Sequence, residues 1–398
     1  MMTTLDKLFK ALEDREHMMI DIRRHLHEHP ELSFEEEETG AYIKDFYKGK
    51  DVTMTHPVEG QHALIVDIEG GKPGKTIALR VDFDALPIQE ETDLPFKSKN
   101  DGVMHACGHD VHTANLMALA DALIEIKDEL PGTIRIVHQH AEEVVPGGAK
   151  SVMASKALDN VDEIYGIHVA PNAPPGVVAY TKGYAFAGSS VFTLKLQGRG
   201  GHAATPHRAN DALMAGTKFV DRAQTIVSRH IDPKASGVVT IGSFHAPGGF
   251  NAIQNEVTIK GTIRYLKDEL GQSMYEQLQQ IVKGIEDSYG VEAKLDFQFG
   301  YPVLYNHPDE TESVVQTLKQ SQGNYIKQVF EVPPLMGAED FAYYVKDIPG
   351  TFFIVGCMPE GVTDPYGNHH PKFEVNEACM LVASKSLGEI ALNRLTQT

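Results

Sequence analysis

Cysteine is scarce in this chain of 398 residues, which contains three: Cys107, Cys357 and Cys379. An odd and sparse set does not fit the disulfide framework of a secreted protein, so a reducing, cytoplasmic setting is expected. No C-x-x-C pair occurs, and this excludes a zinc ribbon.

Basic residues are also few, since Lys and Arg total 36 against 55 Asp and Glu, for a formal net charge of −19. Phosphate contacts need concentrated positive charge, so nucleic acid is excluded as a partner. No uninterrupted apolar run reaches the roughly 18 residues of a membrane-spanning helix. The N-terminal stretch MMTTLDKLFKALEDREHMM lacks the apolar segment of a signal peptide. We therefore expect neither a nucleic-acid nor a membrane partner.

Helical and strand-like patterns alternate in the first half of the chain. Apolar residues at helical spacing predict a single helix from Leu5 to Leu26 and further helices near 39–47 and 111–127. Strands are expected within 62–70, 75–87, 131–143 and 161–171. This alternation is typical of an α/β domain with a mostly parallel sheet.

The pattern changes after residue 185. Residues 186–299 read strand, helix, two strands, helix and strand, which is the ferredoxin-like order of an α+β domain. Roughly 110 residues suffice for a small domain. We therefore predict a catalytic domain of residues 1–185 and 300–398, interrupted by an inserted domain of residues 186–299.

The stretch HACGHDVHTA, residues 105–114, concentrates groups that bind metals. In an extended segment Cys107 and His109 point the same way, and a thiolate beside an imidazole suits a borderline-soft divalent metal. Asp110 could cap the helix that follows, or hold the ring of a liganding histidine. The alternatives are a cysteine packed as a small apolar side chain, or a cysteine hydrolase with Cys107 as nucleophile.

A second motif, HAEE, follows the apolar strand TIRIV. Open α/β sheets bind ligands at the carboxyl ends of their strands. Because adjacent residues of an extended chain face opposite ways, one of Glu142 and Glu143 can bind metal while the other acts as a general base. A solvated acidic loop is the alternative, although Gly147 and Gly148 favour a close approach of the backbone.

Two further histidine signals are individually weak. His168 ends an apolar strand, where a histidine is usually a core residue, and His369 and His370 precede a proline as in many turns. Together the motifs place Cys, His, Glu, His and His at successive strand ends. Five candidate ligands exceed the three protein ligands of a mononuclear catalytic zinc site, so a binuclear hydrolytic centre is plausible.

These motifs, in this order along essentially the whole chain, resemble the M20 family of metallopeptidases and aminoacylases. The resemblance is greatest to the amidohydrolase subfamily that includes hippurate hydrolases, N-acetyl-diaminopimelate deacetylases and auxin-conjugate hydrolases. The residues that carry it lie in RRHLHEHPELSFEE, LRVDFDALPI, HACGHDVHTA, HAEEVVPGGA, GIHVAP, GRGGHAATPH, GTIRY, MGAEDFAYY and HHPKF.

The resemblance implies a set of site residues. The implied metal ligands are Cys107, His109, Glu143, His168 and His369. Glu142 is the implied general base, and His369 is preferred over His370 because the family pattern is His-x-Pro-x-Phe. The family's His-x-Asp motif is replaced by Asp82-x-Asp84, so neither aspartate is assigned to the metal, and Asp84 is expected to orient the site. His105 and His112 are not expected to be ligands.

The inserted domain resembles the family's lid and dimerisation domain, which implies a homodimer. His202 in GRGGHAATPH is then expected to stabilise the oxyanion, from across the dimer or by lid closure. Asn251 and Arg264 match positions that bind the substrate's carboxylate, for which the planar guanidinium is suited. Asn251 is followed by Ala-Ile-Gln where the family usually has Val-Ile-Pro, a departure that could loosen this loop.

The expected function is hydrolysis of an N-acyl amino acid with two divalent ions per subunit. Manganese or zinc is expected, and cobalt or nickel would also fit this donor set. A dipeptidase or other exopeptidase is the second reading, because the same centre cleaves peptide amides. A catalytically silent metal-binding scaffold is the third, and the adjacent Glu142 and Glu143 argue against it, since a scaffold needs no base.

Overall fold

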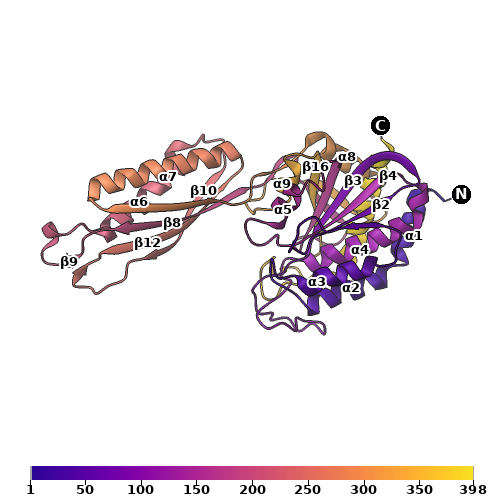
Figure 1. Cartoon of the computed structure of the whole chain (residues 1–398), viewed down its shortest axis with the longest axis horizontal. Coiled ribbons are helices and arrows are strands. Elements are labelled where there is room, and N and C mark those ends of the chain that lie inside the picture. The colour runs from indigo at the N-terminus through magenta and orange to yellow at the C-terminus, as the bar shows by residue number, and fades with distance from the viewer. Residues whose placement is uncertain (1, 398) are drawn as a thin grey trace. The chain divides into compact units, whose positions relative to one another are not determined.

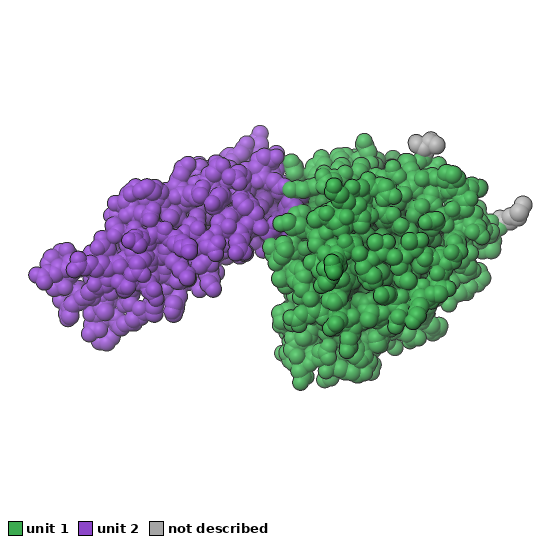
Figure 2. Space-filling model, viewed as in Figure 1, with its two compact units in different colours: residues 1–185, 305–333, 340–398 green, residues 186–304, 334–339 purple. Residues whose placement is uncertain are grey.

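The computed structural model describes residues 2–397. It divides into a first unit, residues 1–185, 305–333 and 340–398, and a second unit, residues 186–304 and 334–339 (Figure 2). Within the described residues, no helix combines the length and the apolar character needed to cross a bilayer.

The first unit is built on an eight-stranded sheet (Figure 1). In sheet order its strands are β1 (Thr53–Thr55), β2 (Leu64–Glu69), β4 (Pro131–Gln139), β3 (Lys72–Asp82), β5 (Glu163–Ala170), β16 (Gly350–Gly356), β6 (Val177–Tyr180) and β15 (Gln328–Glu331). The four central strands β4, β3, β5 and β16 run parallel, while β2 and β6 pair antiparallel with their inner neighbours. Long buried runs in the central strands fit a sheet covered on both faces. The expected α/β class is confirmed.

Helices pack on this sheet and on one another. Their bounds are α1 (Thr4–Glu13), α2 (Glu16–Glu28), α3 (Glu37–Tyr47), α4 (His109–Ile126), α5 (Gly148–Ala154), α8 (Pro308–Gln320), α9 (Ala342–Val345) and α10 (Ala378–Thr396), with a 3₁₀ turn at Lys127–Glu129. The side chains of α4 are almost all buried, because α1, α2, α10 and strand β3 surround it. The first turn of this buried helix carries His109.

The single helix expected from Leu5 to Leu26 is wrong, because the structure has two helices there. α1 ends at Glu13 and α2 begins at Glu16. The guanidinium of Arg15 donates to the carbonyl of Ala11 at 2.9 Å and to Asp121 at 2.7 Å. This side chain satisfies a carbonyl that a continuing helix would use, while the apolar spacing runs on across the break.

The second unit contains β8 (Gly188–Gln197), α6 (Ala212–Thr225), β10 (Gly237–His245), β12 (Glu256–Tyr265), α7 (Asp268–Tyr289) and β13 (Glu292–Phe299). Its antiparallel sheet has the order β10-β12-β8-β13, which is the ferredoxin-like order. The smaller elements are β9 (Gly201–His202), η2 (Pro206–Arg208), a π-helical turn (Ile226–His230) and β11 (Ala252–Ile253). The short strands β7 (Gly183–Phe186) and β14 (Leu304–Asn306) lie where the chain passes from one unit to the other. The expected ferredoxin-like order is confirmed.

Candidate metal centre

Five side chains from four chain segments of the first unit gather at one site: Cys107 and His109 lie at the start of α4, Glu143 follows β4, His168 lies near the carboxyl end of β5, and His369 precedes α10. The Sγ atom of Cys107 lies 3.3 Å from Nε2 of His168. The Oε1 atom of Glu143 lies 3.3 Å from Nε2 of His369 and 3.8 Å from Nε2 of His109. The ligand atoms form two groups, each with all its atoms within 4.8 Å of one another. The first group is Cys107, His109 and His168, and the second is Cys107, Glu143 and His369. Cys107 belongs to both groups.

The turn at Gly108 brings Cys107 and His109 to the same site. Gly108 has φ 96° and is the N-cap of α4. A side chain there would be strained in this left-handed conformation, and its Cβ would lie 2.5 Å from a methyl carbon of Val169. The two candidate ligands are therefore joined by a tight glycine turn and not by the extended segment expected from their spacing.

In His168 and His109, a hydrogen bond at Nδ1 leaves Nε2 directed towards the other candidate ligands. His168 donates from Nδ1 to the carbonyl of Val169 at 2.7 Å, which leaves Nε2 facing Cys107. Burial, and then His112, lowers the pKa of His168 to about 3, so this ring is neutral as a ligand must be. His109 bonds Asp84 through Nδ1 at 3.1 Å. Its Nε2 is buried without a hydrogen-bond partner among the described residues.

The two adjacent glutamates are both directed into this site. The ligand atoms of Glu142, Glu143 and His109 lie within 4.8 Å of one another. Glu142 is buried, with 7% of its surface exposed. Oε1 of Glu143 has no donor in hydrogen-bond geometry among the described residues, although it is buried. A buried oxygen and a buried nitrogen that both lack a hydrogen bond are the atoms that a bound cation would satisfy.

The electrostatics of the site also favour a cation. Burial opposes a charge on His109, yet the carboxylates of Asp82, Asp84 and Glu143 raise its pKa to about 10. Burial, and then Glu143 and Glu142, raises the pKa of the Cys107 thiol well above its usual range. A thiol in these surroundings is neutral unless a positive ion stabilises the thiolate, so a nucleophilic Cys107 is disfavoured. Sulfur, nitrogen and oxygen donors together fit two divalent transition-metal ions.

The structure distinguishes the two adjacent C-terminal histidines. His369 adopts φ 68° and donates its backbone N–H to the carbonyl of Ala106 at 2.7 Å, which brings its ring to Glu143. The ring of His370 instead stacks on Tyr366, with centroids 4.2 Å apart. Of the two rings, that of His369 therefore lies among the candidate ligands.

The roles expected for Asp110 are wrong. It makes no capping bond at α4, whose N-cap is Gly108, and it bonds no candidate ligand. Its Oδ2 accepts bonds from Nε of Arg23 at 2.8 Å and from Nδ1 of His27 at 2.9 Å. These partners lie on α2, more than 80 positions away, so no local spacing could indicate them. Asp84 holds the ring of His109 instead.

Asp82 and His112 form a hydrogen-bonded pair beside the candidate ligands, and the sequence did not predict this pair. His112 bonds Asp82 through Nδ1 at 2.6 Å, and its Nε2 accepts the backbone N–H of Val169 at 3.0 Å. Both ring nitrogens are therefore engaged, and the second bond fixes the backbone next to His168. The only sequence signal is the i, i+3 spacing of His109 and His112 on one helix.

The remaining predicted residues lie in the second unit. His202 on β9 is exposed and is paired with Ala252 of β11. The backbone of Asn251 accepts the N–H of Ala203 at 3.1 Å, so His202 and Asn251 are neighbours. Arg264 lies near the other end of β12, roughly 26 Å of extended strand from its start. Burial lowers the pKa of Arg264. Within the second unit of a single chain, Arg264 and His202 therefore lie far apart.

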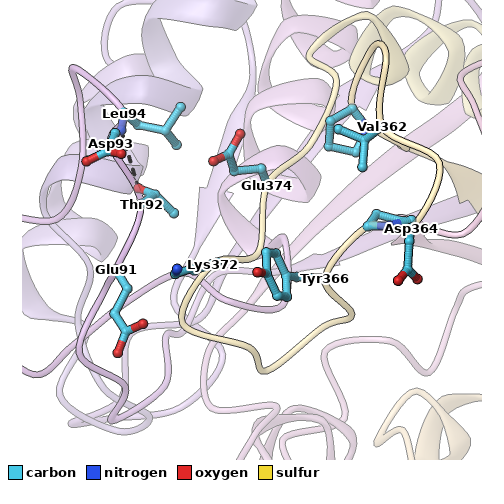
Figure 3. Close-up of a pocket in the computed structure, with 11 residues that line it drawn as sticks. Glu91, Thr92, Asp93, Leu94, Val362, Asp364, Tyr366, Lys372 and Glu374 are labelled. Carbon is cyan, nitrogen blue, oxygen red and sulfur yellow. Dashed lines mark hydrogen bonds between the residues drawn. The ribbon is translucent and has the colours of Figure 1, made fainter.

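A pocket of about 440 Å³ opens between residues 91–94 and residues 359–374 in the first unit. The ionisable side chains of its lining, apart from Tyr366, are Glu91, Asp93, Asp364, Lys372 and Glu374. In Figure 3 the side chain of Glu374 lies between Leu94, on one wall of the pocket, and Tyr366, on the other. Four carboxylates against one lysine give the lining an excess of negative charge, which disfavours an anionic ligand.

Known proteins resemble the chain over nearly its whole length. The sequence profile of Peptidase family M20/M25/M40 matches residues 78–393. A protein named amidohydrolase YhaA from Bacillus subtilis (strain 168) is 43% identical over 391 residues, 98% of each chain. An N-acetyldiaminopimelate deacetylase from Priestia megaterium is 36% identical, covering 92% of this chain and 96% of that one. The solved YxeP protein of Bacillus subtilis, described as a dinuclear metal binding peptidase, has TM-score 0.82 and 32% identity, covering 97% of this chain and 100% of that one.

Proposed function

Because this chain belongs to peptidase family M20/M25/M40 and hydrolyses amide bonds, we propose that it removes the acyl group from an N-acylated amino acid. The observation that carries the proposal is the adjacent pair of buried Glu142 and half-buried Glu143 beside His109, since only one of the two carboxylates is needed as a ligand. The deacetylase relative supports the substrate class, as its name specifies an N-acetyl amino acid.

Cys107, His109, Glu143, His168 and His369 would hold two divalent ions, for which manganese or zinc, and also cobalt or nickel, suit the donor set. Bound there, the ions would lower the pKa of a water molecule towards about 7 and polarise the scissile carbonyl. The dinuclear relative supports a pair of ions over a single one.

Glu142 would act as the general base. It takes a proton from the water that attacks the carbonyl carbon, and it then gives this proton to the nitrogen of the departing amine. Its position beside Glu143 and His109 keeps it close to the reacting atoms. The bonds of Asp84 to His109 and to the backbone of Glu143 keep two ligands in place throughout.

The second unit would supply the remaining substrate contacts in a homodimer. His202 donates a hydrogen bond to the oxyanion, while Arg264 and Asn251 bind the substrate's carboxylate. The separation of His202 from Arg264 along β12 supports contributions from two protomers, because one protomer does not bring them together. The edge strand β10 offers unpaired backbone groups to a second copy. Light scattering that gives a monomer at working concentration would contradict this assembly.

The proposed location is the cytoplasm. All three cysteines, Cys107, Cys357 and Cys379, are free and buried, which suits a reducing compartment.

An assay of the metal-loaded protein on N-acetyl amino acids and on unblocked dipeptides tests the substrate class. We expect turnover of the N-acetyl compounds to exceed that of the dipeptides in kcat/KM. Faster turnover of the dipeptides would favour an exopeptidase. The dinuclear relative, which is described as a peptidase, supports this second candidate. Absence of hydrolysis across both panels at full metal loading would favour a silent scaffold.

A further inference from the structure

The carboxyl groups of two buried side chains accept backbone N–H groups of the segment that carries Glu142. Oε1 of Glu36 accepts the N–H of Ala141 at 2.7 Å, and Oδ2 of Asp84 accepts the N–H of Glu143 at 2.9 Å. Glu36 is fully buried, and it lies 105 positions before Ala141 in the chain. The residues on either side of the base, Ala141 and Glu143, therefore each donate a backbone N–H to a buried carboxyl group.

Glu36 occupies the N-cap position of α3 but does not cap it. Its side chain makes no capping bond. Glu31 does this work instead, because its two carboxylate oxygens accept the N–H groups of Glu38 at 3.0 Å and Thr39 at 2.7 Å. Glu31 thus satisfies the N–H groups of the helix, and the carboxyl group of Glu36 is directed to the loop that follows β4.

Ala141 is held in an unfavourable conformation. Its φ of 50° lies in the left-handed region, which costs energy for a residue with a Cβ. Its carbonyl accepts the N–H of Gly148 at 2.9 Å, and its own N–H is bonded by Glu36. Because Ala141 is fully buried, loss of the Glu36 oxygen would leave this N–H with neither water nor protein partner. The turn would then relax and move Glu142.

We propose that Glu36 is a positioning residue for the amide hydrolysis, which holds Glu142 in its reactive place through the backbone N–H of Ala141. The inference rests on the proposed function for its kinetic consequence, although the hydrogen bond itself does not. Glu36 acts through the backbone and contacts no substrate in this scheme.

The proposal predicts different effects for two substitutions of Glu36. Glu36→Gln keeps an oxygen that accepts the N–H, whereas Glu36→Met has a similar length and no acceptor. Burial, and then Asp84, raises the pKa of Glu36 to about 8, so an uncharged side chain is well tolerated here. Glu37→Gln and Glu37→Met are matched controls, because Glu37 is the exposed neighbour of Glu36.

The kinetic experiment compares these variants at equal metal loading. We expect Glu36→Met to lower kcat by about 100-fold with KM little changed, as expected for a misplaced base. Glu36→Gln should stay near the native kcat, and both Glu37 variants should match the native enzyme. Equal losses in the Gln and Met variants, or a loss confined to KM, would overturn the positioning role.

Hydrogen exchange gives a second readout that does not depend on activity. In Glu36→Met the Ala141 amide should exchange about 10-fold faster than in the native protein, while Glu36→Gln retains its protection. Unchanged exchange in Glu36→Met would overturn the proposal even if the enzyme is active. Faster exchange in a protein that hydrolyses no amide would instead refute the proposed function and leave this bond established.

Discussion

The carboxylate of Asp84 accepts the backbone N–H of Glu143 at 2.9 Å, although the two residues lie 59 positions apart. The same carboxylate bonds Nδ1 of His109 at 3.1 Å and accepts the hydroxyl of Ser33 at 2.7 Å. One side chain therefore orients two candidate ligands from different segments of the chain.

Replacing Asp84 should weaken metal binding. In Asp84→Asn one oxygen is lost as an acceptor, so either His109 or Glu143 loses its support. We expect the affinity for divalent metal to fall by about 10- to 100-fold. Metal titration followed by elemental analysis measures this, with Asp101→Asn in an exposed loop as the control. Native affinity in Asp84→Asn would show that these bonds do not orient the ligands.

Replacing Glu142 should remove turnover and leave metal binding intact. Glu142→Gln has the same shape but accepts no proton, so we expect kcat to fall by about 10²- to 10⁴-fold. Steady-state kinetics and metal content together check this prediction. Glu143→Gln is the informative comparison, because loss of a ligand should reduce metal content as well as kcat. Near-native activity of Glu142→Gln would mean that another group is the base.

Metal removal and thiol alkylation should have opposite effects. Cys107 is buried, and in the loaded enzyme its sulfur would be engaged by the metal, so iodoacetamide at pH 7 should leave the activity unchanged. A chelator should abolish activity, and added divalent metal should restore it. Inactivation by iodoacetamide together with indifference to the chelator would instead identify a cysteine hydrolase.

Acid should destabilise the fold partly through His138. Burial lowers the pKa of His138 to about 3, and its Nε2 shares a hydrogen bond with the hydroxyl of Tyr47 at 2.9 Å. An unfolded histidine has a pKa of about 6.5. Between these values the unfolded chain binds a proton that the folded chain does not, so the free energy of unfolding falls as the pH falls from 6.5 towards 3.

The variant His138→Gln removes this titration and keeps an acceptor for Tyr47. Its free energy of unfolding should fall less steeply between pH 6 and pH 4, by about 1.4 kcal/mol per pH unit. Urea unfolding at several pH values measures the slope, and the exposed His17→Gln serves as the control. A slope equal to that of the native protein would refute the assignment to His138.

Much of the fold and the shortest motifs could be predicted because local spacing determines them. Alternating strand and helix patterns indicated the α/β unit and the ferredoxin-like order. Cys107 and His109, or Glu142 and Glu143, are so close in sequence that a single turn decides where they point. Gathering four such segments into one site required only that parallel strands end at the same edge of a sheet.

Contacts between distant segments could not be predicted from one sequence. Asp110 bonds Arg23 and His27 on another helix, and no pattern around Asp110 distinguishes this from a helix cap. Glu36 lies in a run of four glutamates, and only the fold shows that it is the buried one. The break between α1 and α2 depends on Arg15, whose partners Asp121 and Glu125 lie more than 100 positions away.

The first unit is discontinuous in sequence, because the second unit is inserted in it. Cys107 and Glu143 therefore precede the second unit in the chain, whereas His369 follows it. An ion held by these three residues joins segments more than roughly 200 residues apart, so it restricts the unfolded chain as a long-range cross-link does. Metal supply would then govern how long the protein survives heat and proteases as well as how fast it works.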